Sequence, residues 1–197
     1  KEVFNQTKIW NHKGFHFGRI SINISGRQLS DDKFVQWMKE LIQETKTNPQ
    51  YYELEITESW LIEDPDKSAN VLTQLHDLGF HLSIDDFGVA HSSLNYLKCF
   101  PVDTIKIDRS FTRDITTSEE SMAIISAIIA IGNNLNLNIL AEGVETKEQL
   151  EKLEAAGCNE IQGFYFSKPQ PVNILEMAQR ELQNSTKEFQ APHSISA

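Results

Sequence analysis

Short alternating segments and longer amphipathic segments follow one another along the whole chain. In residues 19–25, isoleucine occupies every second position and polar residues lie between, which is the period of a β-strand with one apolar face. The same reasoning predicts further strands at 51–59, 82–86, 103–110, 138–144 and 161–166. Helices are predicted at 1–10, 34–43, 65–78, 92–98, 118–134, 146–156 and 173–182.

Strand and helix thus alternate six times, which is typical of a parallel β-sheet covered by helices. Two α/β architectures fit this pattern, an open doubly wound sheet and a (β/α)8 TIM-like barrel. A closed barrel needs eight strands. The chain therefore forms either an open sheet or an N-terminally incomplete barrel of about six βα units. The 197 residues suit one domain, expected at 1–183, and the polar stretch 184–197 is expected to be disordered.

Composition and charge narrow the possible functions. No apolar run reaches the roughly 20 residues that span a membrane, so no membrane segment is expected. The formal net charge of -10 disfavours DNA as a partner, and an anionic ligand would need bound cations or a local basic spot. Cys99 and Cys158 lack a CxxC or metal-like spacing, so we expect free thiols in a reducing, cytoplasmic compartment.

Hydrogen-bonding and charged residues occupy one face of five of the six predicted strands, although strands buried between helices are usually apolar on both faces. Each of these residues alone fits a solvated turn or a simple ion pair. Their recurrence near the same end of successive strands instead indicates one convergent site, at the carboxyl edge where barrel enzymes bind substrate. The residues are Asn23, Glu55, Asp85, Lys106 with Asp108, Glu142, and Gln162 in the sixth strand.

The chemistry of this set favours hard cations. Asp85 and Asp86 are adjacent carboxylates at a strand end, and they repel each other unless they are solvated or share a cation. Oxygen ligands without clustered Cys or His suit Mg²⁺ or Mn²⁺. Asp85 could bridge two ions, with Asp86 on the second, and such a pair can clamp a phosphodiester. Beside metals, Lys106 is expected to have a lowered pKa and to hold or deprotonate the attacking water.

Six motifs in order resemble the EAL-domain phosphodiesterases, from about Arg19 to Pro171. They are Asn23–Ser25 with Arg27 and Gln28, Glu53–Ser59, Ile84–Gly88 with Ser92–Leu94, Lys106–Phe111, Ala141–Thr146, and Gln162–Pro169. The resemblance implies a (β/α)8-type barrel that hydrolyses cyclic di-GMP to pGpG with two Mg²⁺ or Mn²⁺ ions. It also implies a homodimer through this domain, and a GGDEF or sensor domain elsewhere in the full-length chain.

The resemblance also assigns roles to individual positions. Asn23, Glu55, Asp85 and Asp86 would be metal ligands. Lys106 and Glu142 would position or activate the water, with Asp108 and Gln162 around them. Glu58 would brace the loop after Asp86, Glu145 would lie near the guanine, and Ser25 belongs to the substrate and loop positions.

Two departures from the family pattern bear on activity. The Glu-Ala-Leu tripeptide of the family's first strand is absent, which agrees with the count of six strands and indicates a piece of the domain. The loop after Asp86 reads Val89-Ala90-His91 where the family usually has Thr-Gly-Tyr, and His91 is expected to be a surface residue rather than a ligand. In the family this loop couples dimer contacts to metal binding.

Two hypotheses for the function follow. In the first, the intact protein is a cyclic di-GMP phosphodiesterase, and these residues alone show weak or no turnover because a metal ligand is missing. In the second, the domain is degenerate and binds cyclic di-GMP or a protein partner without hydrolysis. A kinase reading of Asp-Phe-Gly fails, because the Gly-rich loop, the Val-Ala-Ile-Lys strand and the His-Arg-Asp loop are all missing.

Overall fold

A six-stranded sheet lies at the centre of the computed structural model, which describes residues 1–15, 17–89 and 97–178. All neighbouring strands are parallel and follow the order of the sequence. Within the described residues the sheet is open, with β1 and β6 at its two edges. The strands are β1 (Ile20–Ile24), β2 (Tyr52–Thr57), β3 (His81–Phe87), β4 (Thr104–Ile107), β5 (Asn138–Ala141) and β6 (Glu160–Ile161).

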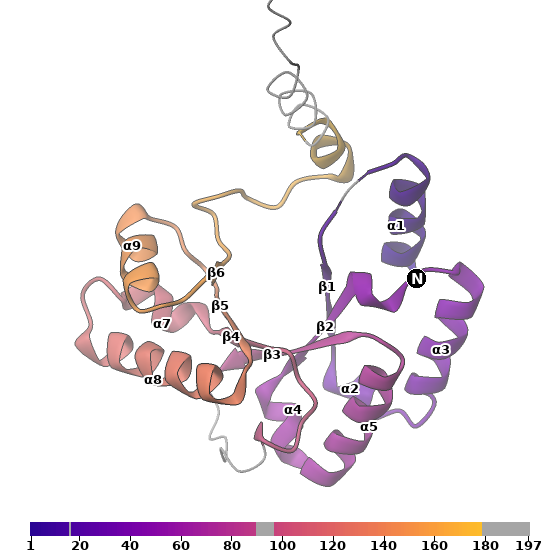
Figure 1. Cartoon of the computed structure of the whole chain (residues 1–197), viewed down its shortest axis with the longest axis horizontal. Helices are drawn as coiled ribbons and strands as arrows, with labels where there is room; N and C mark the ends of the chain where they lie inside the picture. The colour runs from indigo at the N-terminus through magenta and orange to yellow at the C-terminus, as the bar shows by residue number, and fades with distance from the viewer. Residues whose placement is uncertain (16, 90–96, 179–197) are drawn as a thin grey trace, which may run out of the picture.

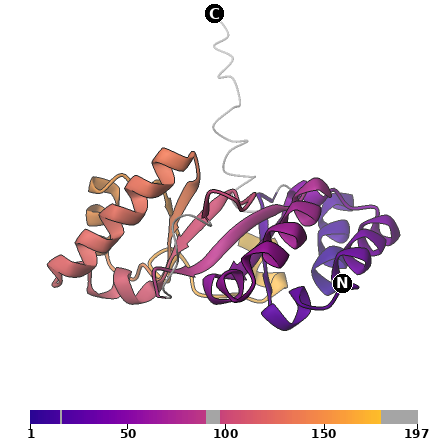
Figure 2. The ribbon, with the colours of Figure 1, turned by 90° about the horizontal axis from the view of Figure 1, so that it is seen from below.

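Helices cover the outside of the sheet in an arc (Figure 1). Figure 2 shows the N-terminal helices, in indigo and purple, and α8, in salmon, at opposite ends of the curved sheet. The longer helices are α1 (Glu2–His12), α3 (Phe34–Thr45), α5 (Pro65–Asp77), α8 (Glu119–Leu135) and α9 (Lys147–Ala155). The shorter ones are α2 (Gly26–Leu29), η1 (Pro49–Tyr51), α4 (Glu58–Glu63) and α7 (Arg109–Asp114), and residues 172–178 are also helical.

The core lies between the helices and the aliphatic face of the strands. Leu54 pairs with Leu82 in the register of β2 and β3, and Ile84 pairs with Ile105 in the register of β3 and β4. All four side chains are buried. Burying a side chain of this size stabilises the fold by about 1.5–3 kcal/mol, so this face provides much of the stability of the domain.

The last described segment crosses the opening of the arc toward α1 (Figure 1). Glu176 accepts a hydrogen bond from Trp10 Nε1 at 3.0 Å and pairs with Lys13 Nζ at 2.9 Å. Residues 172–178 are therefore tied to the C-terminal end of α1. The last described segment thus contacts the first helix across the opening of the arc.

The six predicted strands and the described helices between them are confirmed, and four strand ends differ by two or more residues. The sixth strand is wrong beyond Ile161, because residues 163–166 form a turn. A Cβ on Gly163 would lie 2.0 Å from the Val144 carbonyl oxygen, so the chain passes directly against that backbone instead of extending. The second and fourth strands end earlier than predicted, where α4 and α7 begin, and the fifth strand ends at Ala141 instead of residue 144.

Some predicted features lie outside the described residues. These are most of the helix at 92–98, the end of the helix at 173–182, the tail 184–197, and Ala90 and His91 of the altered loop. Val89 is described and exposed. None of the described helices combines the length and the hydropathy required to cross a membrane.

Candidate active site

The register of the sheet gathers the predicted polar residues on the face opposite the core. Asn23 pairs with Glu55 across β1 and β2, and Glu55 pairs with Ser83 across β2 and β3. Asp85 lies two residues further along β3, and therefore on the same face as Ser83. Since parallel strands end at the same edge, these side chains lie on adjacent strands near the carboxyl edge.

Lys106 lies at the centre of this face, and its side chain is almost completely buried. Its Nζ atom is 2.5 Å from Glu142 Oε1, 2.6 Å from Glu55 Oε1 and 3.2 Å from Asp85 Oδ1. These acids come from the end of β5, from β2 and from β3, so three strands besides β4 contribute. Three carboxylates face one ammonium group, so the cluster has fewer positive than negative charges. In a buried site such unpaired charge is costly.

The protonation of the cluster follows from these contacts. Burial opposes the charge of Lys106, but hydrogen bonds to Glu142 and Glu55 outweigh it and raise its pKa well above the ordinary value. The lowered pKa was predicted for Lys106 beside metal ions and stays a prediction for that state; with carboxylates around the ammonium group, its pKa is raised. Burial raises the pKa of Glu142, and the contact with Lys106 counteracts only part of that effect.

Asp86 and Asp108 form a second acidic contact beside the first. Asp86 has a φ of 55° at a register shift between Ile84 and Phe87, so its side chain leaves the strand alternation. Burial, then the charges of Asp85 and Asp108, raise the pKa of Asp86. Burial would also raise the pKa of Asp108, but hydrogen bonds from Ser110 outweigh it and lower that pKa. Two carboxyl groups in contact need a shared proton or a cation between them.

The donor chemistry of these residues fits a hard cation. Within the described residues, Asp85 Oδ1 is buried and makes no hydrogen bond, although Lys106 Nζ lies 3.2 Å away as an ion pair. Such an oxygen can accept a metal ion. In this arrangement no three His, Cys, Asp or Glu side chains of the described chain already converge as a metal site. The Lys106 ammonium group instead lies among the carboxylates. Metal binding would therefore require the carboxylate side chains to turn away from Lys106 and toward the ion.

Glu58 ties down the backbone after Asp86. It is the first residue of α4 and is buried, and its Oε2 atom accepts a hydrogen bond from the Gly88 amide at 3.0 Å. Gly88 has a φ of 97°, which glycine adopts without strain. The contact lies where the resemblance implied it, between the start of α4 and the loop after β3.

The remaining predicted residues lie around this centre. Ser25 caps α2 in a capping box with Gln28. Gln162 is exposed just after β6, and its backbone exchanges hydrogen bonds with the end of β5 and the segment after it, at Ala141 O and Val144 N. Asn23 is exposed on the edge strand β1. Glu145 lines a pocket of about 570 Å³ together with Asp108, Arg109, Ser110, Arg113, Gly143 and Gln149.

Two buried hydroxyl groups were missed by the sequence reasoning. Ser83 and Thr104 pair in the register of β3 and β4, on the same face as Lys106. Neither hydroxyl oxygen has a hydrogen-bond partner in the part of the chain that the structure describes. The strand alternation places both on the polar face, and that was the signal available. The basic side chains Arg109 and Arg113 at the pocket were also missed.

Comparison with known proteins identifies the family. Residues 1–169 match the EAL domain. The chain belongs to the EAL domain family. The signaling protein YkoW of Bacillus subtilis is 44% identical over 175 residues, which are 89% of this chain and 22% of that protein. The cyclic di-GMP phosphodiesterase PdeR of Escherichia coli is 39% identical over 89% of this chain and 26% of its own length. The chain thus spans about a quarter of the curated relatives it matches.

Solved EAL structures have the same architecture. The PaMucR phosphodiesterase in complex with c-di-GMP superposes with a TM-score of 0.85 at 40% identity, over 88% of this chain and 70% of that one. The EAL domain of Mycobacterium smegmatis DcpA gives a TM-score of 0.76 at 34% identity, over 94% and 80% of the two chains. The parallel sheet described here is therefore the EAL type of the TIM-barrel-like fold.

Proposed function

We propose that this domain hydrolyses cyclic di-GMP to the linear dinucleotide pGpG with two Mg²⁺ or Mn²⁺ ions. The main support is the buried cluster of three carboxylates around Lys106, in which Asp85 Oδ1 forms an ion pair but no hydrogen bond among the described residues. Family membership adds to it, because relatives such as PdeR are named cyclic di-GMP phosphodiesterases. The acids also lie at the carboxyl edge of the parallel sheet, which is the edge where barrel enzymes have their active sites.

The chain's own residues would divide the work as follows. Asn23, Glu55, Asp85 and Asp86 would hold the ions, which would polarise the phosphodiester and lower the pKa of a bound water. Lys106 keeps its charge and donates hydrogen bonds, so it would hold the attacking water and offset the charge of the phosphate. Glu142 would take the proton of that water, since burial raises its pKa toward the neutral range where a general base works best.

The pocket beside Asp108 is suited to a nucleotide base. Its volume of about 570 Å³ lies within the usual range for small-molecule sites. Glu145 offers a carboxylate to the N–H groups of a guanine edge, and Arg109 supplies positive charge next to it. We therefore place one guanine of cyclic di-GMP in this pocket, with Gln162 beside it after β6, and Ser25 at the opposite edge of the sheet, after β1.

Further features of the proposal concern the longer protein. We infer a homodimer through this domain, a GGDEF or sensor domain elsewhere in the parent chain, and a cytoplasmic site of action. The further domain is motivated by the small share of the relatives' length that these residues span, the homodimer by the resemblance to the family, and the compartment by the two free cysteines. Gel filtration and sequencing of the parent gene test the first two inferences directly.

The decisive experiment measures pGpG formation from cyclic di-GMP by the full-length protein with Mn²⁺. Asp85→Asn should lower turnover by more than about 100-fold, because even outer partners of a metal ligand matter by 10–100-fold. Asp31→Asn is the matched control, since Asp31 is an exposed residue outside the site. The proposal fails if the wild type forms no pGpG, or if Asp85→Asn matches it.

A second candidate function is binding without hydrolysis. It is favoured by the Lys106 ammonium group lying among the acids, and by the altered loop that begins at Val89. Micromolar binding of cyclic di-GMP without Mn²⁺-dependent turnover in the full-length protein would support it. The 197 residues alone are expected to turn over weakly or not at all, and robust pGpG formation by them would contradict that expectation.

A further inference from the structure

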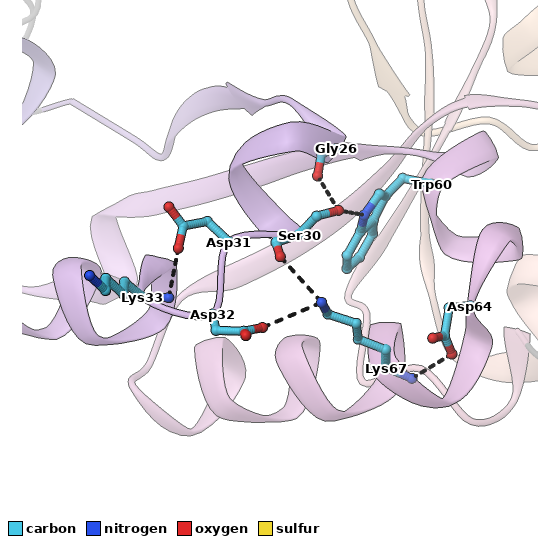
Figure 3. A network of polar contacts seen from close by, with 8 residues as sticks. All are labelled: Gly26, Ser30, Asp31, Asp32, Lys33, Trp60, Asp64 and Lys67. Carbon is cyan, nitrogen blue, oxygen red and sulfur yellow. Dashed lines mark hydrogen bonds and ion pairs between the residues drawn. The ribbon is translucent and has the colours of Figure 1, made fainter.

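The short helices α2 and α4 follow the two strands that carry Asn23 and Glu55, and one side chain joins them. Trp60 on α4 is only 6% exposed. Its indole Nε1 donates a hydrogen bond to Ser30 Oγ at 3.1 Å, and Ser30 Oγ donates to the Gly26 carbonyl at 2.8 Å (Figure 3). Gly26 begins α2 and Ser30 caps its end. The indole is therefore linked to both ends of α2.

The indole ring also packs directly on the backbone of α2. A Cβ placed on Gly26 would lie 2.8 Å from Cδ1 and 3.2 Å from Cγ of Trp60. Any larger residue at position 26 would therefore push α2 away from α4. The contact combines a close apolar approach with a hydrogen bond, which few side chains other than Trp can provide.

A second link in the same network is weaker. Lys67 Nζ on α5 donates to the Ser30 carbonyl at 3.2 Å and lies 3.4 Å from Asp32 Oδ1 (Figure 3). Both charged side chains are exposed, and exposed pairs of this kind contribute about 0–1 kcal/mol. Trp60 is the buried part of the network, so it carries most of the restraint.

The restraint matters because α2 has only four residues. A single helical turn does not hold its own position in water and depends on tertiary contacts. Through Ser25, α2 is directly continuous with the end of β1 and with Asn23. On the other side, α4 begins with Glu58, which accepts the hydrogen bond of the Gly88 amide. Trp60 therefore lies between two segments that carry predicted metal ligands.

We propose that Trp60 is a positioning residue of the candidate active site: by locking α2 onto α4, it fixes Asn23 at the end of β1 and, through Glu58, the backbone after Asp85 and Asp86. The proposal builds on the proposed function, because it assigns a purpose to the geometry of those ligands. Trp60 itself touches no substrate or ion in this assignment.

The first test needs neither metal nor substrate. Hydrogen exchange of the Gly88 amide is measured in the whole 197-residue chain for Trp60→Phe, which keeps an aromatic ring without the donor, and for Ser30→Ala, which removes the acceptor at the surface. Both should speed exchange at Gly88 by about three- to tenfold, the range set by one net hydrogen bond. Amides of Ile105 and Ile139, in β4 and β5, should not change.

Trp37→Phe is the matched control. Trp37 is 45% exposed on α3, and among the described residues its side chain forms no hydrogen bond with Trp60, Ser30 or Gly26, so exchange at Gly88 should be unaffected. Unchanged exchange at Gly88 in both test variants overturns the proposal. Uniform acceleration at Gly88, Ile105 and Ile139 also overturns it, because that pattern reports a loss of global stability and no local positioning.

The second test separates positioning from stability at the site itself. In the full-length protein, Ser30→Ala and Trp60→Phe should raise the Mn²⁺ concentration for half-maximal turnover by about three- to tenfold, and kcat at saturating Mn²⁺ should stay near the wild type. A variant that merely lowers the folded fraction would reduce kcat and leave the Mn²⁺ dependence unchanged, which counts against the proposal. If the wild-type protein shows no turnover, the proposed function is rejected. The hydrogen-exchange rate of the Gly88 amide still tests the positioning role of Trp60, because it needs no activity.

Discussion

Both faces of the central strands β2 and β4 are buried, yet the side chains on the two faces have different roles. Leu54 and Glu55 are neighbours on β2, one on each face, and both are largely hidden from water. Leu54 packs in the aliphatic core, whereas Glu55 contacts the Lys106 ammonium group. Burial of the leucine stabilises the fold. Burial of the glutamate carboxylate costs free energy unless a positively charged partner compensates for its lost hydration.

This difference teaches how to separate stability from function in the domain. Three of the buried side-chain oxygens that lack a hydrogen bond in the described chain lie on the polar face: Ser83 Oγ, Asp85 Oδ1 and Thr104 Oγ1. On the aliphatic face, by contrast, the buried hydroxyl group of Tyr52 is satisfied by Thr7 Oγ1. Groups that are buried without full compensation are expected where the site serves a ligand. Substitutions on the two faces should therefore separate stability from activity.

The largest effect on stability is expected from Leu54→Ala. Removing a fully buried leucine side chain should lower the free energy of unfolding by about 2–5 kcal/mol, from lost burial and the cavity left behind. Urea unfolding measures this change. Mn²⁺ affinity of the remaining folded protein should equal that of the wild type, and a parallel loss of affinity would show that the two faces are not separable.

Glu55→Gln, one residue away, should have the larger effect on turnover and the smaller effect on stability. It keeps the size of the side chain and weakens one charged contact of Lys106, so the unfolding free energy should fall by only about 1.5–3 kcal/mol. Turnover should be lost, because a predicted metal ligand becomes neutral. If this variant kept full turnover, the assignment of Glu55 to the ions would be wrong.

The sequence predicted the two faces well because each depends on a local pattern. Isoleucine or leucine at every second position marks the core side of β1, β2 and β3, and the same alternation placed Glu55 and Lys106 opposite it. Helices α2, α4 and α7 were not predicted, because they have four to six residues and so lack a periodic signal. The end of β6 was missed because the chain turns at Gly163 where it packs against the Val144 backbone. Such a tertiary contact leaves no local pattern in the sequence.

The pairing within the site could not be read from the sequence. The residue types converging at the strand ends were visible, but not that Lys106 lies closer to Glu55 and Glu142 than to Asp85. That choice depends on side-chain geometry across four strands. The link from Trp60 to Gly26 and Ser30 is hidden for the same reason, since it joins residues about thirty positions apart through two short helices.

A smaller effect is expected from the titration of Lys106. Its pKa in the folded state lies above 10.5, its ordinary value, so its stabilising contribution is present below pH 10.5 and is lost as the pH rises further. Above that pH the unfolded chain releases the proton and the folded chain retains it, so the unfolding free energy falls by up to about 1.4 kcal/mol per pH unit.

Lys106→Met should remove the contribution of Lys106 to the slope of unfolding free energy against pH. Urea unfolding at a series of pH values from 9.5 to about 11.5 compares the slopes of the two proteins, and the other lysines act as a shared background. The reading depends on the slope and not on the starting stability, which the substitution also changes. Equal slopes would mean that Lys106 does not retain its proton through contact with Glu55 and Glu142.

The smallest effect distinguishes a satisfied hydroxyl group from an unsatisfied one. Thr104→Val exchanges a buried hydroxyl that has no partner among the described residues for a methyl group of similar size. Thr45→Val makes the same exchange where the hydroxyl donates to Leu41 O at 2.7 Å and contacts Thr47 Oγ1 at 2.9 Å. The first should leave the unfolding free energy unchanged or raise it by less than about 1 kcal/mol, and the second should lower it by about 1–2 kcal/mol. An equal loss in both would show that Thr104 has a partner such as bound water, and the polar face would then be better satisfied than its protein contacts indicate.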